Sequence, residues 1–211
     1  VLQSTFPGNS GLEFSFNRAE HDPISSLVTP VPVPITISPT SETIVACNHT
    51  MLIDQPNLWS ADEPFVHTLV LSLINESDGS VIQSESCRVG FRSILIDGGL
   101  ITLNGKRALF RGVNVHEHDP LYGHRVSRDL IEADVKLLKR SNFNSIRTSH
   151  YPHTHWMYEF CTLYGLYVVD EANIETHGML PYAGRLADDP SWRDAFFQRL
   201  KRMYYRDKTH P

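Results

Sequence analysis

The sequence predicts a multidomain β and α/β chain, with an antiparallel β-sandwich over residues 1–97 and the first three βα units of a larger α/β domain over residues 98–211. One observation is a change of rhythm along the chain. Residues 1 to about 43 are rich in Pro and Ser, apolar residues alternate with period two from there to about residue 97, and afterwards strand-like and helix-like stretches alternate. The other observation is that polar clusters directly follow the strand-like stretches of the second part.

Composition and charge exclude several classes of protein. The chain is 41% hydrophobic and 20% charged, which is typical of a globular protein. Its net charge of -5 is mild and its 19 basic residues form no run, so we expect no nucleic-acid partner. No apolar stretch approaches the roughly 18 to 20 residues of a membrane span, so we expect no membrane partner. Cys47, Cys87 and Cys161 lack the spacing of a disulfide framework or a zinc site, and the cellular compartment stays unknown.

The first part carries the signals of an antiparallel sandwich. Its Pro-rich start, "VTPVPVPITISPTSET", favours edge strands or an extended linker, because proline cannot donate to a sheet ladder. In "FVHTLVLSL" every second residue from Phe65 to Leu73 falls on one face of a strand. The turn signal "NESDG" follows, and then a second strand around "SVIQSESCRVGF". Short strands at this spacing indicate a sandwich.

A hairpin begins the second part. Asn104-Gly105 lies between "GLITL" and "RALFRGVNV", and Asn-Gly favours a tight turn because both central positions need positive φ. The apolar residues of "RDLIEADVKLLKR" then follow a helical period, with Ser127 as the predicted N-cap.

Alternating strands and helices continue to the end of the sequence. "FNSIRTSH" predicts a strand, "THWMYEFCTLY" a helix that ends at Gly165, and "LYVVDE" a strand. Asp189 and Pro190 open a third helix that runs to about Tyr205.

This order is typical of parallel βα units. The clusters "HEHD", "RTSHYPH" and "DEANIETH" each stand where a predicted strand ends. In a TIM (β/α)8 barrel the catalytic groups gather at the C-terminal ends of the strands, so the three clusters should meet at one mouth. A doubly wound open sheet is the alternative, but the chain has no Gly-rich phosphate loop. Since only three of eight units are present, we expect a fragment of the barrel, with both ends cut.

The first two clusters offer histidines and an arginine. His116 and His118 should point the same way, either to hold a metal, as in amidohydrolase-type hydrolases, or to contact substrate hydroxyls, with a polar loop as the alternative. Arg147 needs a carboxylate partner, because its charge cannot be neutralised. His150 could donate a hydrogen bond to a polar ligand. His153 and His155 follow in the loop, where we expect them to be exposed.

The third cluster offers oxygen and nitrogen ligands. Glu175 and His177 bring a carboxylate and an imidazole within one residue of each other. That pair suits a shared divalent ion, with a third carboxylate from elsewhere. A loop that caps the sheet is the alternative.

Two stretches carry a resemblance to a known family. "NSIRTSHYPHTHWMYEFCTLYGLYVV" resembles the first signature of glycoside hydrolase family 2, although Thr162 stands where that pattern expects Asp or Asn. "DEANIETHGM" is similar to the long bacterial β-galactosidases of the family, whereas its β-glucuronidases carry a different run after "DE". The resemblance covers roughly residues 57–211 and is weak before them. It implies an immunoglobulin-like sandwich followed by the start of the catalytic TIM barrel.

The resemblance also implies residue roles. His116 and His150 match histidines that hydrogen-bond the galactosyl hydroxyls, and Arg147 matches the arginine that orients the nucleophilic glutamate. Glu175 and His177 match two Mg²⁺ ligands, which leaves Asp170 and Glu171 to support the strand end. A monovalent cation would be bound by parts that this chain lacks.

The same resemblance places the acid/base and nucleophile glutamates after the fourth and seventh barrel strands, so neither is among these residues. We therefore expect part of a retaining β-galactosidase that acts on β-galactosides, is a homo-oligomer at full length, and is inactive as residues 1–211 alone. Two alternatives remain: a metal-dependent hydrolase of the amidohydrolase type, which depends on His116 and His118, and a non-catalytic sugar-binding module.

Overall fold

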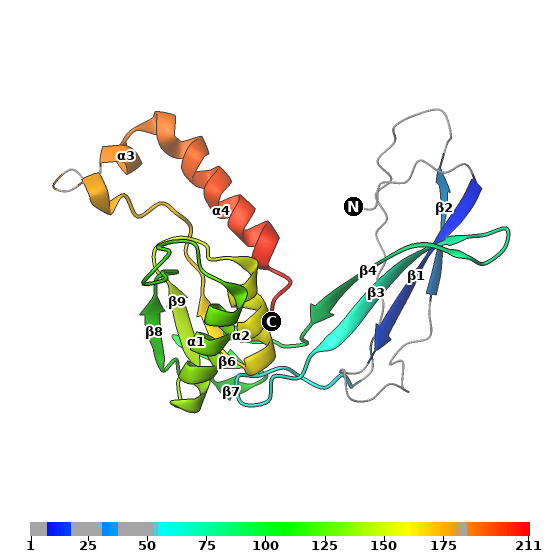
Figure 1. Ribbon diagram of the computed structural model, residues 1–211, viewed down its shortest axis with the longest axis horizontal. Helices are drawn as coiled ribbons and strands as arrows, with labels where there is room; N and C mark the ends of the chain where they lie inside the picture. Colours follow the sequence, from blue (N-terminus) through cyan, green and yellow to red (C-terminus); the bar gives the residue numbers. More distant parts are fainter. Residues whose placement is uncertain (1–7, 18–30, 38–52, 54, 180, 182–184) are drawn as a thin grey trace. The chain divides into compact units, whose positions relative to one another are not determined.

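The computed structural model describes residues 8–17, 31–37, 53, 55–179, 181 and 185–211 (Figure 1). The chain divides into two compact units. One comprises residues 1–57 and 66–89, and the other residues 58–65 and 90–211. The predictions for Pro23, Pro30, Pro39 and Cys47 lie outside the described residues.

The first unit contains a four-stranded antiparallel sheet in the order β2-β1-β3-β4. Its strands are β1 (Gly8–Asn17), β2 (Val31–Ile37), β3 (His67–Asn75) and β4 (Val81–Val89). β2 contains Pro32 and Pro34 and pairs only with β1 within the described sheet. An edge strand leaves one row of backbone groups unpaired, so it tolerates proline. The predicted edge strand is confirmed there, as is the antiparallel pair joined by the "NESDG" turn.

The second unit contains two three-stranded sheets. The parallel sheet has the order β10-β9-β8 and consists of β8 (Gly112–Val115), β9 (Ser145–Thr148) and β10 (Tyr167–Val169). The other is an antiparallel meander of β5 (Ile94–Asp97), β6 (Leu100–Leu103) and β7 (Lys106–Arg107). Asn104 and Gly105 form its tight turn at φ 49° and 76°, as the sequence predicts.

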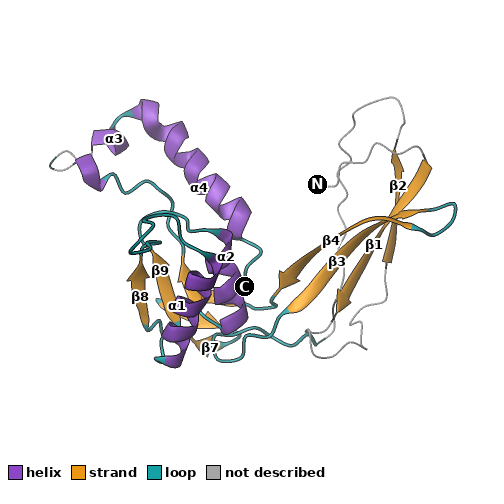
Figure 2. Cartoon of the chain, in the orientation of Figure 1, coloured by secondary structure: helices purple, strands orange, loops and turns teal. Residues whose placement is uncertain are grey.

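Helices α1 (Arg128–Arg140) and α2 (His155–Tyr164) cover one side of the parallel sheet (Figure 2). Ile131 and Val135 of α1, Phe160 of α2 and Ile146 of β9 are almost completely buried in the core between them. Short helices η1 (His177–Met179), α3 (Arg185–Asp188) and η2 (Pro190–Trp192) precede α4 (Arg193–Asp207). No helix in the described ranges is long and apolar enough to cross a bilayer.

Local signals set the helix ends as predicted. The Ser127 hydroxyl accepts a hydrogen bond from the Leu130 amide (3.2 Å) and caps α1. Gly165 ends α2 in the left-handed conformation at φ 76°, which a residue without Cβ adopts at little cost. The Asp189 carboxylate accepts from the Ser191 amide, so the third predicted helix begins as the short helix η2 and continues as α4.

Residues 58–65 belong to the barrel unit, although the residues on either side of them belong to the other. Trp59 is fully buried, donates from Nε1 to the Thr162 carbonyl (2.8 Å) and meets the Tyr167 ring edge-on. The Lys139 ammonium donates to the carbonyls of Ala61 and Gly165. The segment is therefore fixed to α1 and α2 by polar contacts as well as by packing.

Candidate active site

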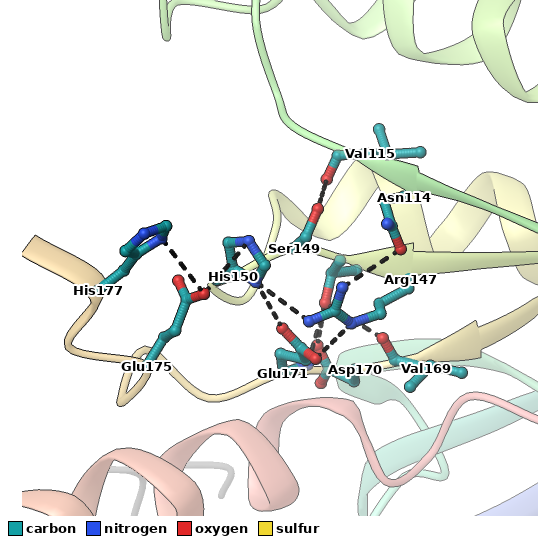
Figure 3. A network of polar contacts seen from close by, with 11 residues as sticks. Asn114, Val115, Arg147, Ser149, His150, Val169, Asp170, Glu171, Glu175 and His177 are labelled. Carbon is teal, nitrogen blue, oxygen red and sulfur yellow. Dashed lines mark hydrogen bonds and ion pairs between the residues drawn. The ribbon is translucent and has the colours of Figure 1, made fainter. Parts of the chain in front are cut away.

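The C-terminal ends of the three parallel strands bring the predicted polar clusters together. Arg147 on β9 is in register with Asn114 on β8 and with Val169 on β10. The residues that follow each strand therefore emerge at one edge of the sheet, as expected for a barrel mouth. Figure 3 shows a line of polar side chains that runs across this edge from His177 to Arg147.

Arg147 lies at the centre of this site. Its Nε donates to Oε1 of Glu171 (2.5 Å), and its Nη1 donates to Oδ1 of Asn114 (3.3 Å). Nδ1 of His150 lies 3.1 Å from Nη2 of Arg147 and 3.2 Å from Oε2 of Glu171. That nitrogen accepts from the arginine when unprotonated and donates to the carboxylate when protonated. The predicted carboxylate partner of Arg147 is thus Glu171, whereas Asn114 was not foreseen.

Glu171 is held in the charged form. The hydrogen bond from Arg147 is the main cause that lowers the pKa of Glu171, the contact with His150 adds to it, and desolvation opposes both. A carboxylate with a lowered pKa carries no proton at neutral pH and cannot act as a general acid. Glu171 therefore organises the site and is not a replacement for a catalytic acid.

The two predicted substrate-binding histidines lie together. The rings of His116 and His150 meet edge-on with centroids 5.6 Å apart, and Tyr151 lies 5.9 Å from His116. His116 is exposed. His118 instead meets His124, with centroids 6.0 Å apart. The structure brings His116 to His150 and pairs His118 with a residue that was not predicted.

Glu175 and His177 converge on the open side of the site. Oε1 of Glu175 lies 3.8 Å from Nδ1 of His177 and 3.5 Å from Nε2 of His150. The side chains of the pair are 41% and 65% exposed. One oxygen and one nitrogen that face solvent suit a hydrated divalent ion, which needs few protein ligands. Within the described part of the chain, no group of three or more His, Cys, Asp or Glu residues could hold a metal.

Asp170 supports the strand end from the opposite side of the sheet, as predicted. Its Oδ1 accepts from the hydroxyls of Tyr158 (2.7 Å) and Thr148 (3.1 Å). Burial raises the pKa of Asp170, and the two hydroxyl donors partly offset that effect. Burial also raises the pKa of Tyr158, whose hydroxyl therefore stays a donor.

The prediction that His153 is exposed is wrong, whereas His155 is exposed as expected. His153 is only 1% exposed, because its backbone amide donates to the Tyr158 hydroxyl (2.9 Å) and draws the loop inward. Burial lowers the pKa of His153, so its ring stays neutral. Sequence reasoning also missed Glu117, which is buried and accepts from the amide and hydroxyl of Thr154 (2.9 and 2.7 Å).

Polar residues at the C-terminal ends of parallel strands are typical of the active site of a barrel enzyme, and comparison with known proteins identifies the family. Residues 94–211 match the domain described as "Glycosyl hydrolases family 2, TIM barrel domain", and residues 5–92 match "Glycosyl hydrolases family 2". The chain belongs to glycosyl hydrolase family 2. The match begins at residue 5, so the family also covers the Pro-rich start, where the sequence alone gave only a weak resemblance.

Two bacterial relatives are similar to much of this chain. It is 51% identical over 161 residues to a β-galactosidase of Erwinia tasmaniensis, a match that covers 76% of this chain and 16% of the relative. It is 50% identical over 163 residues to a β-galactosidase of Alteromonas mediterranea, covering 77% of this chain and 15% of the relative. The chain thus spans about a sixth of the length of these relatives.

Solved structures confirm the fold class of a sandwich domain followed by the start of a TIM barrel. A family 2 glycosyl hydrolase from Bacteroides cellulosilyticus has a TM-score of 0.77 at 25% identity, covering 98% of this chain and 26% of that one. A β-glucuronidase of Bacteroides uniformis also has a TM-score of 0.77, at 22% identity over 99% of this chain and 24% of that one. The second likeness concerns the fold alone.

Proposed function

We propose that the chain is part of a retaining β-galactosidase that hydrolyses terminal β-D-galactosides. The observation that carries the proposal is the cluster of His116, His150, Arg147 and Glu171 at the strand ends of a family 2 barrel. The relatives at about 50% identity are named β-galactosidases, which favours a galactoside over other glycosides.

His116 and His150 are the proposed contacts to sugar hydroxyls. An imidazole presents one donor and one acceptor when neutral, and a hydroxyl can satisfy either. Glu171 fixes the orientation of His150 through Nδ1, which leaves Nε2 to face the open side. Hydrogen bonds that tighten as charge develops on the sugar would lower the barrier more than they strengthen ground-state binding.

Arg147 is the proposed residue that orients the nucleophilic glutamate. Its guanidinium is fixed in three directions, by Glu171, Asn114 and His150. A guanidinium has five N–H donors, so it keeps capacity for a further carboxylate. We place that glutamate after the seventh barrel strand and the acid/base glutamate after the fourth, at about 5 to 5.5 Å from each other, as retention requires.

Glu175 and His177 are the proposed Mg²⁺ ligands. The exposed oxygen and nitrogen of the pair fit such an ion, with water and a further carboxylate as its other ligands. When bound, the ion would supply positive charge that holds a neighbouring carboxylate in place and lowers its pKa. A monovalent cation and the homo-oligomer remain predictions about the complete enzyme.

The test is to assay the complete protein on matched aryl β-galactoside, β-glucoside and β-glucuronide, and to follow the first anomer released by NMR. We expect a clear preference for the galactoside and release of the β-anomer. Preference for another sugar would overturn the substrate, and release of the α-anomer would overturn retention. If the complete protein hydrolysed no glycoside, the result would favour the alternative of a non-catalytic sugar-binding module. Family membership excludes the amidohydrolase alternative.

A further inference from the structure

The hydroxyl of Thr148 connects Asp170, behind the sheet, to Glu171, which contacts the candidate site. Thr148 is the last residue of β9 and is completely buried. Side chains alternate along a strand, so Thr148 shares the helix-facing side with Ile146, whereas Arg147 lies on the other side with the candidate site. Thr148 therefore does not face the open side of the site.

The Thr148 hydroxyl accepts one hydrogen bond and has two acceptors within reach of its proton. The backbone amide of Glu171 donates to Oγ1 (3.0 Å), and the hydroxyl can donate to Oδ1 of Asp170 (3.1 Å) or to the Val169 carbonyl (3.5 Å), of which the shorter contact favours Asp170. A hydroxyl has one proton and two lone pairs, so it can donate to the carboxylate and accept from the amide together. The Asp170 carboxylate is held in place in turn, because its Oδ1 also accepts a hydrogen bond from Tyr158, a residue that is only 2% exposed.

The hydrogen bond between Thr148 and the Glu171 amide lies just beyond the end of the backbone pairing between β9 and β10. The ladder between β9 and β10 ends at the pair of Arg147 and Val169, two residues before Glu171. Beyond that pair the Glu171 amide donates to the side-chain hydroxyl of Thr148 and not to a backbone carbonyl of β9. The position of the Glu171 backbone thus depends on one threonine hydroxyl.

Glu171 passes this position on to the site. Its Oε1 accepts from Nε of Arg147 and its Oε2 contacts Nδ1 of His150. A shift of its backbone would move both of these side chains, because each oxygen has one of them as its partner. Errors of about 1 Å in a catalytic arrangement can lower a rate by up to roughly a hundredfold.

We propose that Thr148 is a positioning residue: its hydroxyl, oriented by Asp170 and Tyr158, fixes Glu171 and thereby sets Arg147 and His150 for glycoside hydrolysis. This inference rests on the proposed function. The competing explanation is that the hydroxyl only stabilises the fold, as buried hydrogen bonds commonly do.

The experiment compares three variants of the complete enzyme. Thr148→Val keeps the shape but removes the hydroxyl, and Thr148→Ser keeps the hydroxyl. Thr162→Val is the matched control, since Thr162 is also buried (3% exposed) and its Oγ1 is hydrogen-bonded to Nδ1 of His210 (3.0 Å), away from Glu171. For each protein kcat, KM, the melting temperature and hydrogen exchange of the peptide that contains Glu171 are measured.

We expect Thr148→Val to lower kcat and kcat/KM about tenfold with little change in KM, and to speed exchange at the Glu171 amide. Thr148→Ser should restore both, and Thr162→Val should lower only the melting temperature. If Thr148→Val does not fold, Thr148→Ala compared with Thr148→Ser tests the same loss. A Thr148→Val enzyme that melts earlier but keeps kcat within twofold would overturn the positioning role.

Failure of the proposed β-galactosidase function can be distinguished from failure of the positioning role of Thr148. If the parent enzyme prefers another glycoside, the same variants assayed on that glycoside still measure the positioning role. If the parent cleaves no glycoside, the exchange data decide whether Thr148 holds Glu171. Unchanged exchange in Thr148→Val would overturn the inference in that case.

Discussion

Arg147→Lys is the most direct test of how the candidate site is organised. The guanidinium reaches three partners through three different nitrogens, at 2.5 Å (Glu171), 3.3 Å (Asn114) and 3.1 Å (His150). A lysine ammonium is a single point charge and can keep the carboxylate but not all three directions. The two lost contacts are long and the arginine side chain is 37% exposed, so together they contribute about 1 to 2 kcal/mol.

That free energy corresponds to a loss of roughly five- to thirtyfold in kcat/KM. The assay is steady-state hydrolysis of an aryl β-galactoside by the complete enzyme, with Arg140→Lys as control, since Arg140 is exposed in the last turn of α1. We expect the control to match the parent, and both variants to keep the parent's melting temperature within a few degrees. Arg147→Lys activity within twofold of the parent would show that the three-way fixation is not needed for catalysis.

Three further predictions concern the metal, the fold and pH. Glu175→Gln should raise the Mg²⁺ concentration for half-maximal activity by about tenfold or more and shift the pH–rate profile, measured after chelation; an unchanged curve would leave the loop-cap alternative. Gly165→Ala should lower the unfolding free energy by more than about 1 kcal/mol, because φ is +76° and a Cβ would lie 2.3 Å from the Ala61 carbonyl oxygen. Gly79→Ala, at φ +72° with nothing within 4 Å of its Cβ, is the control in the same thermal melts, and equal losses would contradict the clash. Since the folded state lowers the pKa of Glu171, its contribution to stability is present above the usual value of 4.5 and is lost as pH falls through the folded value. Glu171→Gln should therefore flatten the acid limb of melting temperature against pH, and an identical acid limb would speak against that ion pair.

The elements that sequence reasoning predicted well are those set by local chemistry. Ser127, Asn104-Gly105 and Gly165 each satisfy a backbone requirement within a few residues, and each lies where it was predicted. β1 was missed as a separate strand, although the alternation of Leu12, Phe14 and Phe16 was a usable signal among the neighbouring prolines.

The missed parts of the site depend on contacts between elements. His153 follows a proline in a loop, which favours exposure, but the Tyr158 hydroxyl on the next helix holds its backbone and buries it. Glu117 was treated as the residue between two histidines. Period-two alternation already placed Glu117 on the opposite face, yet its partner Thr154 lies 37 residues away and no local pattern indicates it. The carboxylate partner of Arg147 was predictable because a guanidinium that is partly withdrawn from water at a strand end needs an anion.

The path of residues 58–65 has a consequence for how such enzymes can be recombined. The chain passes between the two units three times, after Asn57, after Phe65 and after Val89. A single crossover at Gly90 that joined this barrel to a foreign sandwich would therefore replace Trp59 with whatever residue the donor has there. The Thr162 carbonyl and the Tyr167 ring would lose their partner unless the donor supplied an indole in the same place. Exchange of the two units thus requires that residues 58–65 be transferred together with the barrel, although in the sequence they lie between the two parts of the other unit.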